Sequence, residues 1–237
     1  MLKTPEDIEW MNVDRTKIIG GSDMAGILGY SKWSSPEIVM KQKLLGEEVE
    51  MNDKMFWGLR LEAAVADVYD ELYCGEAFDQ RGEASLFNPP KDKCQVFHPD
   101  HPWLVGSPDR LILNKLSRKI IGGLEIKTIG FFSKKSWKDG VPMYYQTQAQ
   151  VYMMIFGLDE WEFFVLHGGQ AHFHVVLPEN PFMQEEILEK GQAFYKAMAK
   201  GIVGGEDYEQ AMAHYYGAVG GGENEQEGIN SRPMGKI

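Results

Sequence analysis

The pattern of hydrophobic and polar positions divides the chain into an early part with helical spacing and a later part of short apolar runs. In the early part, four apolar residues recur at intervals of three or four positions: Leu61, Val65, Val68 and Leu72. This spacing is typical of a helix with one buried face. We therefore expect a helix over residues 55–73, ended by Gly75, with these four side chains in the core.

Start and stop signals delimit the other helices. Ser35 at the cap and Pro36 in the first turn mark the start of a helix that should end at Gly46. Asn180 and Pro181 mark the start of a last long helix in the same way. The remaining helices are expected over residues 22–28 and 142–156, and the last over residues 181–200.

From Cys94 onward, short apolar runs bounded by turn residues replace the helical spacing. Such runs predict strands, here over residues 95–98, 104–107, 110–113, 120–127, 161–166 and 171–177. This order of helices and strands indicates an α/β (α+β) class with a covered central sheet. We expect one domain over residues 1–216. Residues 217–237 are rich in glycine and polar residues, so we expect a flexible tail there.

Two segments near the centre of the chain could carry chemistry. Residues 107–109 (Ser-Pro-Asp) place the Asp109 carboxylate on a turn before an apolar strand. Within residues 124–127 (Leu-Glu-Ile-Lys), Glu125 and Lys127 are two positions apart in a strand and so point to the same face. If the two strands are neighbours, the three side chains converge. Two carboxylates bind a hard cation and a lysine can orient or activate a water, which suits hydrolysis of a phosphodiester.

Each of these residues also has a plain structural explanation. Pro-Asp before a strand is ordinary turn chemistry, and Glu125 with Lys127 could form a solvated strand face. Leu124 and Ile126 occupy the opposite face, however, and we expect the sheet to be covered. A glutamate and a lysine inside such a sheet would need partners, which could be each other or a metal site.

Two of the predicted helices contain weaker candidates for site residues. Glu62 lies near the start of its helix, where it could simply favour the helix dipole. Gly58, one turn earlier, is unusual inside a helix and leaves room for a ligand or another backbone. Gln148 and Tyr152 lie four apart on one face of a later helix, where a glutamine could donate to a phosphate or a base edge. A plain polar helix face would explain this pair equally well.

The net charge limits the kind of nucleic-acid partner. A formal charge of −11 argues against a protein that coats DNA, because non-specific affinity for DNA comes from neutralised phosphates. It does not exclude a DNA enzyme, since a cleft can be locally positive on an acidic body and bound metal ions add positive charge. Lys134, Lys135 and Lys138 form a small basic cluster just after the Glu125 strand.

Other metal sites and membrane segments have little support in the sequence. The two cysteines cannot supply the roughly four ligands of an iron–sulfur cluster. His167, His172 and His174 have no further ligand nearby, so histidines on a solvated strand face are favoured over a zinc site. No apolar run approaches the roughly 20 residues that cross a bilayer, and the first residues do not form a secretory signal. We therefore expect a cytoplasmic protein without a membrane partner.

Taken together, five segments resemble the phage-type alkaline exonucleases, the lambda-exonuclease and YqaJ-like viral recombinase family of the PD-(D/E)xK nuclease superfamily. These segments are residues 107–109 (Ser-Pro-Asp), residues 124–127 (Leu-Glu-Ile-Lys), Trp57-Gly58 with Glu62, Gln148 with Gln150, and Arg15 with Ile19 and Ser22. The PD…ExK element alone is weak, but all five occur in the family's order between about residues 15 and 177. The resemblance implies a restriction-endonuclease-like core, a central mixed sheet flanked by helices.

The resemblance also implies an activity. Members of the family degrade one strand of linear double-stranded DNA from its 5′ end with Mg²⁺, and several are trimeric rings around the DNA. The chain is thus expected to be a Mg²⁺-dependent 5′→3′ exonuclease that uses two ions, with Mn²⁺ as a possible substitute. It would leave 3′ overhangs for a single-strand annealing protein, in a bacterium that hosts the phage or prophage.

The residue roles follow from the same resemblance. Asp109 and Glu125 would bind metal together with the Ile126 carbonyl, and Glu62 would complete the site directly or through water. Lys127 would position the attacking water or help to deprotonate it. The positions that resemble the family's 5′-phosphate contacts are Arg15, Ser22, Ser107 and Gln148.

The chain departs from the family pattern at two positions. Arg110 follows the catalytic aspartate where glycine is frequent, and Lys17 also replaces a frequent glycine. Neither change removes a ligand, and both add positive charge. The alternatives are a nuclease of the same fold with other polarity or endonuclease action, a non-catalytic DNA-end-binding module, and an unrelated α/β protein with no specific Mg²⁺ site.

Overall fold

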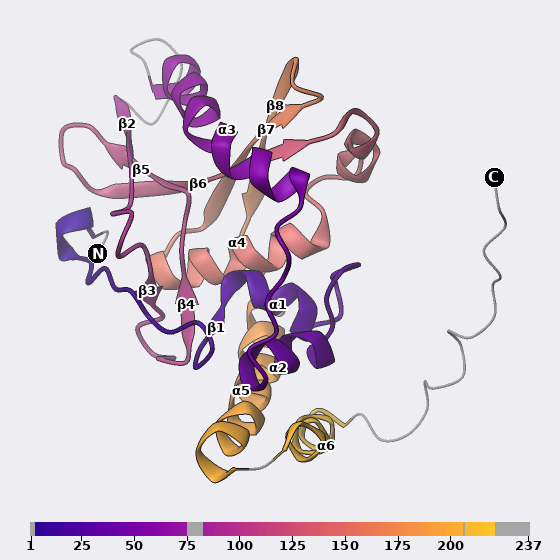
Figure 1. Cartoon of the computed structure of the whole chain (residues 1–237). Helices are drawn as coiled ribbons and strands as arrows, with labels where there is room; N and C mark the ends of the chain where they lie inside the picture. The colour runs from indigo at the N-terminus through magenta and orange to yellow at the C-terminus, as the bar shows by residue number, and fades with distance from the viewer. Residues whose placement is uncertain (1–2, 75–82, 206, 221–237) are drawn as a thin grey trace, which may run out of the picture.

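A computed structural model describes residues 3–74, 83–205 and 207–220. The helices are α1 (Gly21–Ile27), α2 (Pro36–Leu44), α3 (Asp53–Tyr69), α4 (Met143–Phe156), α5 (Pro181–Gly204) and α6 (Tyr208–Ala218). The strands are β1 (Ile19–Gly20), β2 (Ala84–Phe87), β3 (Val96–Phe97), β4 (Leu104–Gly106), β5 (Arg110–Asn114), β6 (Ile120–Ile129), β7 (Glu160–His167) and β8 (Ala171–Pro178). Short helical turns cover Pro5–Asp7, Asp70–Cys74 and Phe131–Trp137. Helices flank a mixed sheet, so the expected α/β class is confirmed (Figure 1).

The larger sheet has five strands in the order β2-β5-β6-β7-β8. Neighbouring strands are antiparallel except β6 and β7, which are parallel because the chain between them crosses over through α4. A smaller sheet has the order β1-β4-β3. Its parallel β1–β4 pair brings the start of α1 beside the end of β4, just before Ser107.

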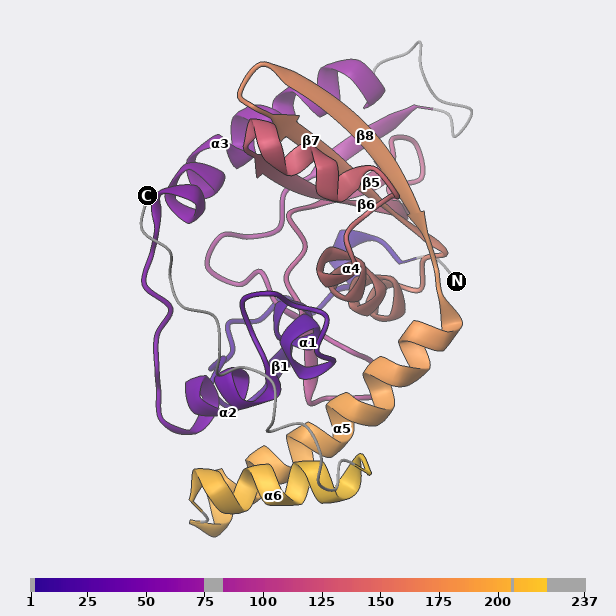
Figure 2. The same ribbon diagram turned by 90° about the vertical axis from the view of Figure 1, so that its right-hand side faces the viewer.

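Two helices cover opposite faces of the larger sheet (Figure 2). On one face, α3 packs through Val65 and Tyr69 against Leu124 and Ile126 of β6. On the other face, α4 packs against the alternate residues of the neighbouring strands, Phe163 among them. The centre of the sheet is therefore covered on both sides, and a polar side chain there is shielded from water.

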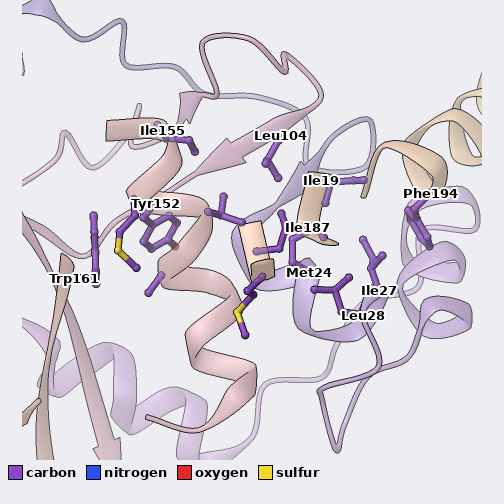
Figure 3. Close-up of a cluster of buried hydrophobic side chains, with 14 of the residues drawn as sticks. Ile19, Met24, Ile27, Leu28, Leu104, Tyr152, Ile155, Trp161, Ile187 and Phe194 are labelled. Atoms are coloured by element: carbon purple, nitrogen blue, oxygen red, sulfur yellow. The ribbon is translucent and has the colours of Figure 1, made fainter. Parts of the chain in front are cut away.

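A second layer of helices lies below α4. Met24 of α1, Tyr152 of α4 and Ile187 of α5 belong to one buried cluster with Leu104 of β4 (Figure 3). The close approach of α1 to α4 depends on Gly21, where an added Cβ would meet the Tyr152 ring at 3.1 Å. This packing fixes the start of α1 against the middle of α4.

Capping residues explain where the helices begin and end. Ser35 accepts a hydrogen bond from the Ile38 N–H at 3.4 Å, and Asn180 accepts one from the Met183 N–H at 3.2 Å, as the sequence signals predicted. Gly157 ends α4 in the left-handed region with φ 68°. The long last helix continues to Gly204 rather than Lys200, and Gly205, with φ 69°, ends it.

The predicted buried face of α3 is partly wrong. Val65 is buried, but Val68 and Leu72 are 41% and 37% exposed. The face toward the sheet instead runs through Val65, Ala66 and Tyr69, where the tyrosine ring fills the space beside Phe164. Regular α-helix ends at Tyr69, and a π-helical turn follows, which changes the spacing that the sequence pattern assumed. The predicted stop at Gly75 lies outside the described residues.

Several elements were not predicted. Strands β1 and β2 and the turn Phe131–Trp137 were overlooked because they are short, and α6 because a glycine-rich segment follows it. A capping box of Asp207 and Gln210 begins α6, which contains Gly217 and Ala218, the first two residues of the expected tail. Residues 221–237 lie outside the described part of the chain. Among the described helices, none combines the length and apolar character needed to cross a membrane.

Candidate active site

The β5–β6 pair brings together the three residues that the sequence singled out at its centre. Arg110 pairs with Leu124, which places Asp109 at the end of β5 beside Glu125 of β6. The Ile126 N–H donates a hydrogen bond to Asp109 Oδ2 at 2.8 Å, and Lys127 Nζ lies 2.6 Å from Glu125 Oε1. The predicted convergence of these side chains is confirmed, and we call Asp109, Glu125 and Lys127 the acidic site.

The acidic site lies inside the covered sheet rather than on a solvated face. Glu125 is 2% exposed, and the alternate residues Leu124 and Ile126 belong to the core beneath α3. The Lys127 ammonium also lies 4.9 Å from the centre of the Tyr145 ring of α4. The alternative of a solvated strand face is therefore wrong for this pair.

The acidic site holds two carboxyl groups and one lysine, so each carboxyl group makes it harder for the other to lose its proton. Burial raises the pKa of Asp109 to about 8, and the Glu125 carboxylate contributes to that increase. Burial also raises the pKa of Glu125, despite the opposing effect of Lys127. For Lys127 burial acts to lower the pKa, but the Glu125 and Asp109 carboxylates outweigh it and raise the pKa. The lysine is therefore charged at neutral pH and acts as a donor.

One carboxylate oxygen in this site has no hydrogen-bond partner among the described residues. Glu125 Oε2 is fully buried and unpaired, whereas Oε1 is held by Lys127. A buried carboxylate oxygen without a partner is costly unless something else binds it. Hard divalent cations prefer oxygen ligands of this kind, so the side chains of this site are chemically suited to bind one.

Glu62 approaches this site from α3 but contacts a different group. Its carboxylate raises the pKa of both Asp109 and Glu125, so it is electrostatically close to them. Its nearest partner is Arg110, with Nη1 2.7 Å from Glu62 Oε1. Accordingly, residues 3–74, 83–205 and 207–220 contain no ready-made cluster of three metal-binding His, Cys, Asp or Glu side chains.

Gly58, one turn before Glu62, is not required by close packing. An added Cβ there would meet only Thr128 Oγ1 of β6 at 3.6 Å, an ordinary contact. The open space predicted around this glycine is thus present, on the side where α3 passes over the end of β6.

The four predicted phosphate-binding residues also lie near one another, and we call Arg15, Ser22, Ser107 and Gln148 the Arg15 pocket. Arg15 Nη2 donates to Ser22 Oγ at 3.1 Å. Gln148 Nε2 donates to the Tyr152 hydroxyl at 2.7 Å, and that hydroxyl donates to the Ser107 carbonyl at 2.9 Å. The packing of α1 on α4 joins the two halves.

Two polar atoms of the Arg15 pocket are buried and unpaired. They are Arg15 Nε and Ser107 Oγ, both able to donate a hydrogen bond. Gln148 connects this pocket to the acidic site, because its side chain also acts to lower the pKa of Glu125. The unpaired donors of the Arg15 pocket are suited to bind an anion. The unpaired Glu125 oxygen in the neighbouring acidic site is suited to bind a cation beside it.

An ion-pair network that includes Lys43 of α2 and Asp23 of α1 holds Arg15 in place. Lys43 of α2 is 8% exposed, and its Nζ lies 2.7 Å from both Asp23 Oδ2 and the Arg15 carbonyl oxygen. Asp23 Oδ2 is also 3.6 Å from Arg15 Nη2. Lys43 was not predicted as a site residue, since nothing in the spacing of α2 separates it from a surface lysine.

The histidines take different positions from those expected. His172 is exposed, but His174 Nε2 lies 2.6 Å from the buried Glu162, and His167 Nε2 lies 2.8 Å from the Phe131 carbonyl oxygen. The expectation of solvated histidines is therefore wrong for His167 and His174. Alternation along β8 was visible in the sequence, but the buried glutamate of β7 that pairs with His174 was not recognised.

Comparisons with known proteins agree with this architecture. Residues 9–159 match the YqaJ-like viral recombinase domain. The uncharacterized protein YqaJ of Bacillus subtilis (strain 168) is 29% identical over 182 residues, which are 76% of this chain and 49% of that protein. The chain thus spans about half the length of the curated relative it matches.

Solved structures show the same fold. The crystal structure of the alkaline exonuclease LHK-Exo from Laribacter hongkongensis matches with a TM-score of 0.56 and 18% identity, covering 87% of this chain and 90% of that one. The structure of LHK-Exo in complex with dAMP matches with the same values. With more than half of its residues matched, this chain belongs to the YqaJ-like viral recombinase domain family.

Proposed function

We propose that this protein is a divalent-cation-dependent deoxyribonuclease that degrades one strand of linear double-stranded DNA from its 5′ end. The observation that carries the proposal is the buried, unpaired Glu125 Oε2 beside Asp109 and the charged Lys127. A site in which two buried carboxyl groups lie beside a lysine donor is suited to metal-assisted hydrolysis of a phosphodiester.

Asp109 and Glu125 are the residues that would hold the cation, with the Ile126 carbonyl and Glu62 as further oxygen ligands. We propose Mg²⁺, in two sites, with Mn²⁺ as a substitute, because all the ligands are hard oxygens. When bound, such ions neutralise charge on the attacking and leaving oxygens of the phosphodiester. Family membership supports the same ligand assignment.

Lys127 would orient the attacking water rather than remove its proton. Its ammonium is held by Glu125 at 2.6 Å, and neighbouring carboxylates raise its pKa, so it donates hydrogen bonds at neutral pH. Of the two roles that the resemblance implied for this lysine, the charge of the site thus favours positioning.

The Arg15 pocket would hold the 5′-phosphate of the DNA end. Its buried donors, Arg15 Nε and Ser107 Oγ, are suited to phosphate oxygens, and Ser22 and Gln148 supply further donors. A phosphate held there would set the scissile bond one nucleotide inward. The complex of the structurally similar LHK-Exo with dAMP supports a site that takes a nucleoside monophosphate.

The wider setting follows from the family. A viral recombinase domain supports a role in recombination, in which the 3′ overhang passes to a single-strand annealing protein. We propose a homotrimeric ring around the DNA, encoded by a phage or prophage and acting in the bacterial cytoplasm. Exonuclease action of other polarity and endonuclease action are the nearest alternatives, whereas a DNA-end-binding module would have no use for an assembled lysine–carboxylate site.

The decisive experiment is digestion of linear duplex DNA labelled separately at its 5′ and 3′ ends, with either a 5′-phosphate or a 5′-hydroxyl. We expect mononucleotides from the 5′ end, with Mg²⁺ but not with EDTA, and faster from the phosphorylated end. Lys127→Ala should be inactive.

The controls separate the alternatives. Glu162→Gln, on the opposite face of the sheet, should digest DNA as the unchanged protein does. Cutting of circular DNA would show that the protein is an endonuclease. Release of mononucleotides from the 3′ end would show an exonuclease of the opposite polarity. Retention of DNA ends without digestion would point to a binding module.

A further inference from the structure

Arg110 makes a contact that the nuclease chemistry described above does not require. It is the first residue of β5 and directly follows Asp109. One guanidinium nitrogen, Nη1, lies 2.7 Å from Glu62 Oε1 and 2.5 Å from the Asp109 carbonyl oxygen. The arginine side chain is 12% exposed and that of Glu62 is 29% exposed, so the pair lies at the edge of the covered site.

This contact occupies a carboxylate that the cation would also use. Glu62 acts electrostatically on both Asp109 and Glu125, yet its Oε1 faces a guanidinium that is always charged. A divalent cation on the same carboxylate would lie close to this guanidinium, and the two positive charges would repel each other. The Arg110–Glu62 pair and a metal-bound Glu62 are therefore competing arrangements.

We propose that Arg110 is a positioning residue that withholds Glu62 from the cation site until an ion is bound there. The inference rests on the proposed function, because it takes Asp109 and Glu125 as the resident cation ligands. It assigns a role to the arginine that stands next to the catalytic aspartate in this chain.

Glu62 can turn away from Arg110 without leaving the guanidinium unpaired. The Asp109 carbonyl oxygen holds the same guanidinium nitrogen, so Arg110 keeps a backbone partner after Glu62 turns away. The ion pair itself is partly exposed, and such pairs are weak enough to exchange. Two arrangements of one glutamate, biased by one ion, make a switch between a site with two available carboxylates and a site with three.

The test is a Mn²⁺ titration of DNA-free protein, in which the free ion is measured by electron paramagnetic resonance. Four proteins are compared: unchanged, Arg110→Gln, Glu62→Gln and the double variant. We expect Arg110→Gln to bind the more weakly held ion roughly tenfold more tightly, because Glu62 is released. In the Glu62→Gln background the same substitution should change the affinity by less than about twofold.

Other outcomes overturn the inference. An equal gain in both backgrounds would mean that Arg110 acts only through its charge on Asp109 and Glu125. A loss of affinity in Arg110→Gln would mean that the arginine holds Glu62 in place for the ion. Unchanged affinity in Arg110→Gln would mean that the pair does not compete with the cation.

Two controls keep the result interpretable. Arg118 lies in the β5–β6 turn, and its Nη2 is 3.5 Å from Glu6 Oε1. Arg118→Gln removes this arginine and should leave Mn²⁺ binding unchanged. Arg110→Lys keeps the charge but loses the fork that reaches Glu62, so it should bind Mn²⁺ more tightly than the unchanged protein if its circular dichroism is native. If the unchanged protein digests DNA but every variant binds Mn²⁺ as the unchanged protein does, the role proposed for Arg110 is refuted and the proposed function is not. Failure of the unchanged protein to digest DNA or bind Mn²⁺ refutes the proposed function as well.

Discussion

Two buried glutamates on neighbouring strands differ in how their oxygens are used. Glu125 of β6 and Glu162 of β7 are 2% and 1% exposed, and they face opposite sides of the same sheet. Glu162 Oε2 accepts from the Tyr69 hydroxyl at 2.6 Å and lies 2.6 Å from His174 Nε2. Glu125 is held by Lys127 through one oxygen only, and its other oxygen is buried and unpaired.

This difference separates a carboxylate that stabilises the fold from one that is kept for a ligand. A buried carboxylate that is hydrogen-bonded to the Tyr69 hydroxyl and to His174, as Glu162 is, joins α3, β7 and β8. Glu125 faces other carboxyl groups and has one cationic partner, Lys127, so a bound cation would stabilise its charged form further. Burial alone therefore does not separate the two glutamates, whereas the unpaired oxygen supports the ligand role proposed for Glu125.

The largest effect should come from removing the charge of Glu125. Glu125→Gln keeps the shape but removes a ligand, and we expect at least about a thousandfold loss of kcat in DNA digestion. Without metal, its free energy of unfolding should stay within about 1 kcal/mol of the unchanged protein, since less repulsion offsets the lost Lys127 pair. Urea denaturation in EDTA measures this, and a large loss of stability would make Glu125 a structural residue.

Glu162→Ala should give the opposite result. The Tyr69 hydroxyl and His174 would lose a shared acceptor in the core, which should cost about 3 kcal/mol of unfolding free energy. The folded fraction should digest DNA at an unchanged rate per molecule. Urea denaturation and the rate per active molecule test this together, and a lower rate with normal stability would place Glu162 in the catalytic machinery.

The pH dependence of stability should sharpen the contrast. Burial and the Glu125 carboxylate raise the pKa of Asp109 to about 8, above its value near 4 in the unfolded chain. The folded protein thus holds more protons between these values, so its free energy of unfolding in EDTA should fall as pH rises from about 4 to about 8.

Two comparisons isolate the contribution of Asp109. Mg²⁺ should reverse part of the decline, because the ion replaces the proton, and Asp109→Asn should show a shallower decline in EDTA. A series of thermal denaturation curves across this range measures both effects. An identical pH profile in Asp109→Asn would contradict the assignment.

The smallest effect concerns the link between the two parts of the site. Tyr152→Phe removes the hydroxyl that accepts from Gln148 and donates to the Ser107 carbonyl, leaving Gln148 free to move. We expect a roughly threefold increase in KM for 5′-phosphorylated ends with little change in kcat. On 5′-hydroxyl DNA the substitution should have no such effect. Equal changes on both ends would show that Tyr152 supports the fold and not the pocket.

The sequence was most informative where neighbouring strands are close along the chain. Asp109, Glu125 and Lys127 belong to one β5–β6 hairpin, so side-chain alternation was enough to predict that they converge. Alternation also predicted that Leu124 and Ile126 would face the opposite side. The caps at Ser35 and Asn180 were equally local signals. The four residues of the Arg15 pocket were found through the family resemblance, and their ligand roles stay predictions.

The rest depended on how separate elements pack. The contact of Arg110 with Glu62 requires the position of α3 over the sheet, which no spacing in either segment encodes. Val68 was misassigned because the buried face of α3 runs through Val65, Ala66 and Tyr69, and Leu72 because the regular helix ends at Tyr69 and a π-helical turn follows. Strand β1 has only two residues, too few for a periodic pattern, and it forms through pairing with the distant β4.

That two-residue strand has a consequence for how the site opens. Arg15 and Ser22 flank β1, which is held by its short pairing with β4, whereas Glu125 lies in the ten-residue β6, between the five-residue β5 and the eight-residue β7. Backbone amides open locally where few hydrogen bonds hold them. Amides near Ile19 should exchange with deuterium well before those near Glu125. In the proposed function, the half that would bind the 5′-phosphate can then rearrange around an incoming DNA end while the half that would cleave stays rigid.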